Sequence, residues 1–439
     1  MSQAVVETMG ALCAITQNLP IGTNLALLQF LWMVLSGQLL SSRGALFPAL
    51  QAIGLPAAAV RRAWAAFRYG AWQIGVMLLL WQRCVEGQSH WQAHRYAGYV
   101  PKAVDITPYW HPATKACRSK HYHPQAGKAL QAVEVGIIGR IGSVTNPQGH
   151  RQRVTVITDL VRGDLNDPST MSFQTRLVKH AAHTLERDEI AVLDAGFEVK
   201  EVQEEGVARY VLRGAKNLTA RRHTLPAYKG RGRRPEYGEK VRPLARQYKD
   251  HTIEATPPDA VETWHEDGRT LRAELWYDLV RPDVKVSEDN ALFHIAVIHD
   301  PRFKTPWLLV SSLKLSAETL WRLYDDRWPV EQVPLVAKQM LGGARQFVSA
   351  PESCQRLPEL TLLASEVLTY LAATLPATPT GFWDRDPKPT AGRLRRLLAR
   401  TPFPDSYPLP GRFRKKASVT DHLPKGIFGH RRRKTTKIA

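Results

Sequence analysis

The chain has 439 residues, of which 44% are hydrophobic and 23% charged, and this composition excludes a disordered protein. The formal net charge of +20 favours a polyanionic partner such as nucleic acid, because surface cations displace the counterions of phosphates. Four scattered cysteines without a CxxC pair argue against a disulfide framework and favour a reducing cytoplasm. The N-terminus lacks the basic region of a secretory signal, so we expect a cytoplasmic protein.

Residues 1–95 are predicted to be helical. The segment 23–42 is uncharged for twenty residues and is long enough to cross a bilayer. Its many Ser, Thr, Asn and Gln residues favour a protein interior instead, so we expect a buried hairpin with the apolar run at 72–81. A membrane span is the alternative interpretation.

Within this region, residues 42–70 resemble a helix-turn-helix. Gly54 suits a left-handed helix end and Pro56 suits the first turn of the next helix. The second helix carries Arg61 and Arg62, which would contact DNA if this helix enters a major groove. An ordinary helical bundle is the alternative.

From about residue 100 the pattern changes to period two with β-branched residues, which predicts strands. The predicted strands are 103–107, 132–142, 153–161, 190–197, 208–214, 271–280, 291–300 and 307–313. An amphipathic helix is predicted at 171–187, and helices dominate again from 316 to 375. The stretch 214–260 is rich in Gly, Pro and Arg, and 376–439 reads as a linker and a basic C-terminal region.

Three carboxylates occupy informative places in this pattern. Asp105 lies in the first strand, Asp194 ends the fourth, and Glu331 lies in a later helix. Mg²⁺ prefers oxygen ligands, and a two-metal site activates one phosphate oxygen while it stabilises another. Acids would hold metal and bases would hold DNA. The alternative is that each carboxylate caps a strand or forms a surface ion pair.

The segment YDDRWPVEQVPLVAK (324–338) decides between these alternatives. Tyr324, Arg327, Glu331 and Lys338 form the pattern Y-x2-R-x3-E-x6-K, whose offsets place all four on one face of a helix. This pattern resembles the signature of the cut-and-paste DDE transposases of bacterial insertion sequences. The resemblance extends from about residue 95 to 375.

The resemblance implies an α/β (α+β) fold with a ribonuclease-H-like mixed sheet, interrupted by a β-rich insertion before Glu331. It implies that Asp105, Asp194 and Glu331 hold two Mg²⁺ ions, for which Mn²⁺ can substitute, and that Tyr324, Arg327 and Lys338 position phosphates. Activated water would nick a transposon end, and the freed 3′-hydroxyl would attack the other strand or target DNA. Double-stranded DNA is the implied partner, bound by a homodimer in a paired-end complex.

The implied domains are a helical DNA-binding domain (1–95), a catalytic domain (96–213 and 300–375), a basic insertion (214–299) and a C-terminal region (376–439). Two other functions stay open: a domesticated nuclease of the same fold, and a non-catalytic DNA-binding regulator. Strand-transfer products would distinguish a transposase from the nuclease, and metal-dependent cleavage would exclude the regulator.

Several nearby residues invite other interpretations. Asp159 competes with Asp105, but it lies on the third strand, which is at the far side of the family's sheet from the fourth. Asp325 and Asp326 are expected to be solvated charges on a helix face. Trp307, Trp321 and Trp328 flank the region of the last acid, and Trp328 is the best candidate to stack on a flipped base. Packing in the core is the alternative for each of them.

Two patterns are weaker still. The irregular spacing of His111, Cys117, His121 and His123 disfavours zinc. The sequence GIIGRIG (136–142) does not open a helix, so a strand and its turn are expected in place of a dinucleotide loop.

The insertion generates a first prediction. Residues 213–249 contain twelve lysines and arginines against two glutamates, a net charge of +10. If this segment binds phosphates near the cut, replacing Arg231, Arg233 and Arg234 with alanine should reduce the slope of log K against log salt concentration by up to about 3. Sequence preference should change little, because phosphate contacts position DNA without specifying it. DNA titrations at several salt concentrations measure this; unchanged slope and affinity would mean that the segment does not touch DNA.

Overall fold

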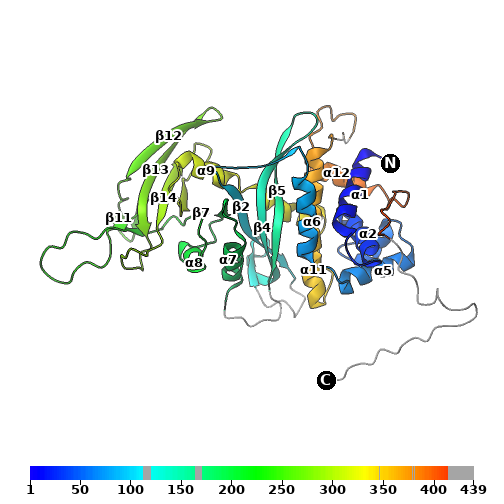
Figure 1. Cartoon of the computed structure of the whole chain (residues 1–439), viewed down its shortest axis with the longest axis horizontal. Helices are drawn as coiled ribbons and strands as arrows, with labels where there is room; N and C mark the ends of the chain where they lie inside the picture. The colour runs from blue at the N-terminus through cyan, green and yellow to red at the C-terminus, as the bar shows by residue number, and fades with distance from the viewer. Residues whose placement is uncertain (112–119, 164–170, 346, 378, 380, 414–439) are drawn as a thin grey trace, which may run out of the picture.

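The structure is a computed structural model that describes residues 1–111, 120–163, 171–345, 347–377, 379 and 381–413. It is a mixed α+β protein in which N-terminal helices pack at one side of a large mixed sheet (Figure 1). The predicted basic C-terminal tail lies mostly at 414–439, outside the described residues.

The helices are α1 (Gln3–Thr16), α2 (Thr23–Leu35), α3 (Gln38–Ser41), α4 (Leu46–Ala52), α5 (Ala57–Tyr69), α6 (Ile74–Glu86), α7 (Phe173–Thr184), α8 (Val199–Glu204), α9 (Ala317–Asp325), α10 (Pro329–Leu335), α11 (Pro351–Thr374) and α12 (Ala391–Ala399), with a 3₁₀ turn η1 (Pro124–Ala126) and a π-helical turn η2 (Val336–Met340). The strands are β1 (Trp91–Ala93), β2 (Val100–Trp110), β3 (Lys120–His123), β4 (Lys128–Thr145), β5 (Arg151–Arg162), β6 (Glu189–Leu193), β7 (Tyr210–Arg213), β8 (Ala220–Arg222), β9 (Lys240–Val241), β10 (Arg246–Tyr248), β11 (His251–Ile253), β12 (Ala260–Glu266), β13 (Arg269–Val280), β14 (Phe293–His299) and β15 (Trp307–Ser311).

The uncharged segment at 23–42 forms the buried helix α2 and the short helix α3. Every residue of α2 from Ala26 to Leu35 is buried. In the part of the chain that the structure describes, no helix is long and apolar enough to cross a membrane. The expected hairpin with 72–81 is wrong, because α2 packs on α5, α1 and α11, whereas α6 packs on β5 and α1.

Helices α4 and α5 confirm the two helices predicted at 42–70. Gly54 has the left-handed φ of 83° that ends α4, and α5 starts directly after Pro56. Arg61 and Arg62 lie on the exposed side of α5, while Val60 and Phe67 face the core. DNA contact by α5 stays a prediction.

Five strands form the part of the sheet that carries the predicted carboxylates, in the order β5-β4-β2-β6-β7. Strand β4 runs antiparallel to β5 and β2, whereas β2, β6 and β7 are parallel. Alternate side chains of each strand enter different cores. On β4, Ile138 packs with Leu177 of α7, whereas Ile137 joins the core that contains α11 and the N-terminal helices.

The sheet continues beyond β7. Strand β15 pairs antiparallel with β7, and β14, β13 and β12 from the predicted insertion follow in order as antiparallel neighbours. Strands β12, β13 and β14 lie at the left of Figure 1, away from the N-terminal helices. Helix α9 covers this part of the sheet, where Leu320 and Leu323 pack with Ile298 of β14 and Leu309 of β15. Helices α9 and α11 therefore cover neighbouring parts of the molecule, and α10 lies between them in the chain.

The glycines of GIIGRIG lie within β4, which confirms the predicted strand. They allow close packing of the sheet. A Cβ atom at Gly142 would lie 2.5 Å from the backbone carbonyl oxygen of Gln92 and 2.4 Å from the Trp91 ring. Residue 142 therefore needs to be glycine for β1 to pair with β4.

This packing predicts that Gly142→Ala destabilises the protein by about 1–3 kcal/mol, because the methyl group overpacks a backbone contact that cannot move away cheaply. Gly75→Ala is the matched control. Gly75 lies in α6, with nothing within 4 Å of an added Cβ atom, so alanine should raise stability by up to about 1 kcal/mol. Urea unfolding of both variants measures the free energies; a Gly142→Ala variant as stable as the wild type would contradict the packing.

Candidate active site

The parallel pairing of β2 with β6 places two of the predicted carboxylates side by side. Val104 pairs with Leu193, so the residues that follow them, Asp105 and Asp194, occupy neighbouring positions on adjacent strands. Asp194 lies just beyond the end of β6, where the chain turns toward α8. The sheet topology thus brings together two acids that are distant in sequence.

The signature residues Tyr324, Arg327, Glu331 and Lys338 do not share one helix, and the expectation of a single helical face is wrong. Helix α9 ends at Asp325, and α10 begins at Pro329, whose missing N–H suits a helix start. Pro334 lies inside α10, which gives way to the π-helical turn η2 before Lys338. A proline inside a helix removes a backbone hydrogen bond, and this loss accounts for the change from α10 to η2 directly after Pro334.

The signature residues nevertheless converge on the two aspartates. The Tyr324 hydroxyl donates a hydrogen bond of 2.8 Å to Oδ1 of Asp194. Nη2 of Arg327 lies 3.5 Å from the same oxygen and also donates to Oε1 of Glu331. One guanidinium therefore connects the acid of α10 to the acid after β6.

The charges of this cluster influence one another. Burial raises the pKa of Asp105 to about 6; Arg327 opposes this rise, and the charges of Asp194 and Glu331 add to it. Burial also acts to raise the pKa of Asp194, but the Arg327 charge and the Tyr324 hydroxyl outweigh it and hold that pKa below its ordinary value. The three carboxylates are thus electrostatically coupled through Arg327.

Lys338 approaches from the other side. Its Nζ donates to Oγ1 of Thr107 at 2.6 Å, two residues beyond Asp105 on β2, and lies 5.0 Å from the centre of the Tyr109 ring. Burial lowers the pKa of Lys338 to about 8, although the charge of Asp105 opposes the shift. This lysine is therefore a cation held beside Asp105 at a desolvation cost.

The residue types of this cluster suit a divalent cation, but the distances between its side chains do not. Carboxylate oxygens are the ligands that Mg²⁺ prefers. Among the described residues, however, no group of three or more His, Cys, Asp or Glu side chains is close enough to hold a metal ion. The Arg327 guanidinium instead links Asp194 to Glu331, and within the described residues its buried Nε and Nη1 have no hydrogen-bond partner.

Asp159 lies away from this cluster. It is on β5, which β4 and β2 separate from β6, and its carboxylate is 3.4 Å from Nε2 of His180. The structure thus brings Asp105, and not Asp159, next to Asp194.

The tryptophans differ in exposure. Trp328 is 54% exposed beside Arg327, whereas Trp307 and Trp321 are 9% and 4% exposed. The Trp307 ring packs edge-on against Tyr324, with centroids 5.1 Å apart. Trp307 and Trp321 are core residues, and Trp328 is the one of the three that a base could reach.

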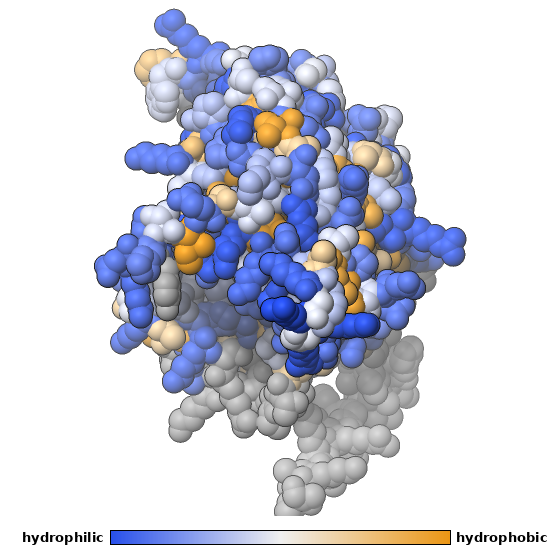
Figure 2. All heavy atoms as spheres, turned by 90° about the vertical axis from the view of Figure 1, so that its left-hand side faces the viewer, coloured by the Kyte–Doolittle hydropathy of each residue, from blue (hydrophilic) through white to orange (hydrophobic). Residues whose placement is uncertain are grey.

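The arginines of the predicted insertion that are proposed to contact DNA are exposed. Arg231, Arg233 and Arg234 lie in the loop between β8 and β9, where Arg233 pairs with Glu236 at 2.8 Å. Figure 2 shows the face of the molecule that carries the insertion as mainly hydrophilic, with hydrophobic residues scattered among the polar ones.

Two of the histidines considered as zinc ligands have other partners. His111 lies 2.6 Å from the carbonyl oxygen of Val348, and His121 lies 2.6 Å from the carboxylate of Glu134. Cys117 lies outside the described residues, so the zinc interpretation is not tested in full.

The expectation for Asp326 is wrong. Its side chain is 2% exposed, and it binds His94 at 2.6 Å and the Tyr96 hydroxyl at 3.2 Å. Asp325 is partly buried and pairs with Arg153 at 2.9 Å. Sequence spacing could not reveal these contacts, because the partners lie 172 to 232 residues away.

Comparison with known proteins adds nothing to this geometry: no protein-family model matches the chain, and no curated protein sequence matches it.

Lys338 gives a prediction with a defined sign. Its folded-state pKa of about 8 lies below its ordinary 10.5, so the unfolded chain binds more protons between these values. Stability contributed by this residue therefore rises with pH through that window, and its burial penalty is complete below pH 8. Lys338→Met removes the penalty, so its stability advantage over the wild type should shrink by up to about 2 kcal/mol between pH 7.5 and pH 10. Urea unfolding across this range tests it, and a pH-independent difference would contradict it.

Proposed function

We propose that the protein is a DNA transposase of the DDE class, which cleaves DNA at transposon ends and joins them to target DNA by 3′-hydroxyl attack on phosphodiesters. One observation carries the proposal. Tyr324, Arg327, Glu331 and Lys338 belong to different structural elements, yet all converge on Asp105 and Asp194. Core packing alone gives no reason for this combination of residue types to gather at one place.

The strand order supports a ribonuclease-H-like sheet. Strand β2, which carries Asp105, lies beside β6, the fourth strand of the β5-β4-β2-β6-β7 unit in chain order, and Asp194 follows β6 directly. Strand β5, the third in chain order, lies at the far edge of the unit. The insertion that precedes Glu331 is β-rich, as the resemblance implies. These features agree with the fold of DDE transposases.

In the proposed mechanism Asp105, Asp194 and Glu331 would hold two Mg²⁺ ions. These ions, when bound, supply activation of the attacking oxygen and stabilisation of the leaving oxygen. Arg327 holds Oε1 of Glu331, so a cation bound by both oxygens of this carboxylate would have to displace the guanidinium. Cation binding and the position of the Arg327 side chain are therefore coupled.

Arg327 would then bind the phosphate. Unpaired buried donors cost about 1–3 kcal/mol each, and Nε and Nη1 of Arg327 are such donors among the described residues. Two adjacent guanidinium nitrogens match two phosphate oxygens. Tyr324 holds Asp194 in orientation, and Lys338 adds positive charge beside Asp105.

The surrounding surface fits double-stranded DNA. The exposed Arg61 and Arg62 of α5 and the exposed arginines of the insertion loop would hold phosphates on either side of the site. Action on paired ends would need a homodimer, and the protein would work on DNA in the cytoplasm. A nuclease with the same carboxylates would cut and not join.

The experiment uses a linear DNA that carries the element's end. Glu331→Gln, Asp105→Asn and Asp194→Asn should each abolish Mg²⁺-dependent cleavage and strand transfer with end binding nearly intact, because they remove a metal ligand with little change of shape. Asp159→Asn is the matched control and should retain activity.

Three outcomes count against the proposal. An inactive Asp159→Asn beside an active Asp105→Asn would show that the first carboxylate is assigned wrongly. Full activity in EDTA would exclude the metal mechanism. Cleavage without strand-transfer products would identify a nuclease.

A further inference from the structure

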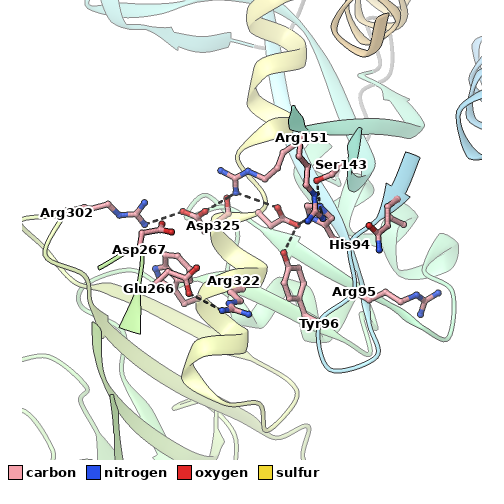
Figure 3. A pocket seen from close by; sticks show the side chains of 15 residues that line it. His94, Arg95, Tyr96, Ser143, Arg151, Glu266, Asp267, Arg302, Arg322 and Asp325 are labelled. Carbon is pink, nitrogen blue, oxygen red and sulfur yellow. Dashed lines mark hydrogen bonds and ion pairs between the residues drawn. The ribbon is translucent and has the colours of Figure 1, made fainter. Parts of the chain in front are cut away.

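A cavity of about 800 Å³ lies beside the end of α9, between the sheet strands β1, β4 and β5 and the loops of the insertion (Figure 3). Its wall contains a chain of three polar side chains from distant parts of the sequence: His94, Ser143 and Asp326. The side chain of His94 is 10% exposed, and those of Ser143 and Asp326 are each about 2% exposed. The carboxylates of the candidate active site do not line this cavity.

The hydrogen bonds of this chain have a defined direction. Nδ1 of His94 lies 2.6 Å from Oδ2 of Asp326, and Nε2 lies 2.6 Å from Oγ of Ser143. A carboxylate only accepts, so Nδ1 carries the proton and donates to Asp326. In neutral His94 the other nitrogen accepts from the Ser143 hydroxyl, and the Tyr96 hydroxyl also donates to Oδ2 of Asp326 at 3.2 Å.

We infer that His94 and Ser143 hold Asp326 as a positioning residue for Arg327, and this inference rests on the proposed function. Asp326 is the residue directly before Arg327, in the break between α9 and α10. The backbone bonds of this turn are local: Asp326 N–H donates to Arg322 O at 3.0 Å, and Trp328 N–H donates to Asp325 O at 3.4 Å. They fix the turn relative to α9, whereas the buried side chain of Asp326 connects it to His94, in a distant part of the chain.

The positions of the partners explain why this anchoring reaches the site. His94 follows β1, and Ser143 lies in β4. Strand β4 pairs with β2, the strand that carries Asp105. Asp326 thus ties the turn to the sheet that carries the aspartates. A displacement of this turn would move the guanidinium away from Asp194 and Glu331.

The same three residue types form the nucleophilic triads of hydrolases, and the geometry distinguishes the two roles. A nucleophilic serine must be reached by its substrate. Ser143 is 2% exposed and lies in β4, where it pairs with Gln92 of β1 on one side and with Arg153 of β5 on the other. Its hydroxyl is committed to His94, which suits an anchor.

The first test compares Asp326→Ala with Asp325→Ala in the full-length protein. Asp326→Ala should lower the cleavage rate by about 100-fold, as expected for a misplacement of about 1 Å, while the Kd for end DNA changes less than about threefold. Asp326→Asn should restore most of the rate, since an amide oxygen still accepts from His94. Asp325→Ala removes partly exposed ion pairs that solvent screens, so its rate should stay within about threefold of the wild type.

The second test does not depend on activity. Hydrogen exchange of the amides of Arg327, Trp328, Val330 and Glu331 should accelerate at least about tenfold in Asp326→Ala and stay unchanged in Asp325→Ala, because the anchor keeps this turn closed. If the wild type cleaves no DNA, the proposed function fails while this measurement still decides the positioning role. Equal exchange in the two variants would overturn the inference, and so would covalent labelling of Ser143 by diisopropyl fluorophosphate.

Discussion

The site depends on one buried guanidinium. Arg327 is 5% exposed and lies among three carboxylates that repel one another when ionised. Burying the Arg327 guanidinium is costly, and its attraction for Asp194 and Glu331, whose side chains are 42% and 43% exposed, offsets part of that cost. Without a cation at this position, the parallel pairing that puts Asp105 next to Asp194 would place like charges together. The fold therefore needs positive charge here, from arginine or from metal.

This requirement explains how the surrounding elements are arranged. Strand β2 and the end of β6 supply the two aspartates, while α9 brings the tyrosine, the turn after α9 brings the arginine, and α10 brings the glutamate. The two helices belong to different hydrophobic cores: Leu320 of α9 packs with the insertion strands, and Val330 of α10 packs with α11 and the N-terminal helices. The break between the helices is therefore a junction of two packed regions, and Arg327 lies in it.

Much of this could be predicted from the sequence, because strand periodicity and the fixed spacing of the signature are local. Alternation located β2, β4, β5 and β6, and the spacing of the signature singled out Glu331 and Lys338. The start of α10 at Pro329 follows from the sequence, because proline suits the first position of a helix, whereas the turn at 326–328 that separates α10 from α9 does not.

Other features depend on contacts between distant segments. Asp326 was expected in solvent, because nothing near it in the chain indicates a partner, and its burial depends on His94, 232 residues earlier. The packing of α6 on β5, and not on α2, likewise depends on the shape of the assembled core. Periodicity identifies which face of an element is apolar, but it does not identify the element that covers that face.

We propose that Asp105, Asp194 and Glu331 form one cation site that Arg327 closes when no metal is bound. Anomalous diffraction from Mn²⁺ in crystals of the protein bound to end DNA would locate such a cation. We expect Mn²⁺ between Asp105 and Asp194 with metal–oxygen distances of about 2.1 Å, and Arg327 detached from Glu331. Manganese bound elsewhere, with Arg327 still on Glu331, would contradict it.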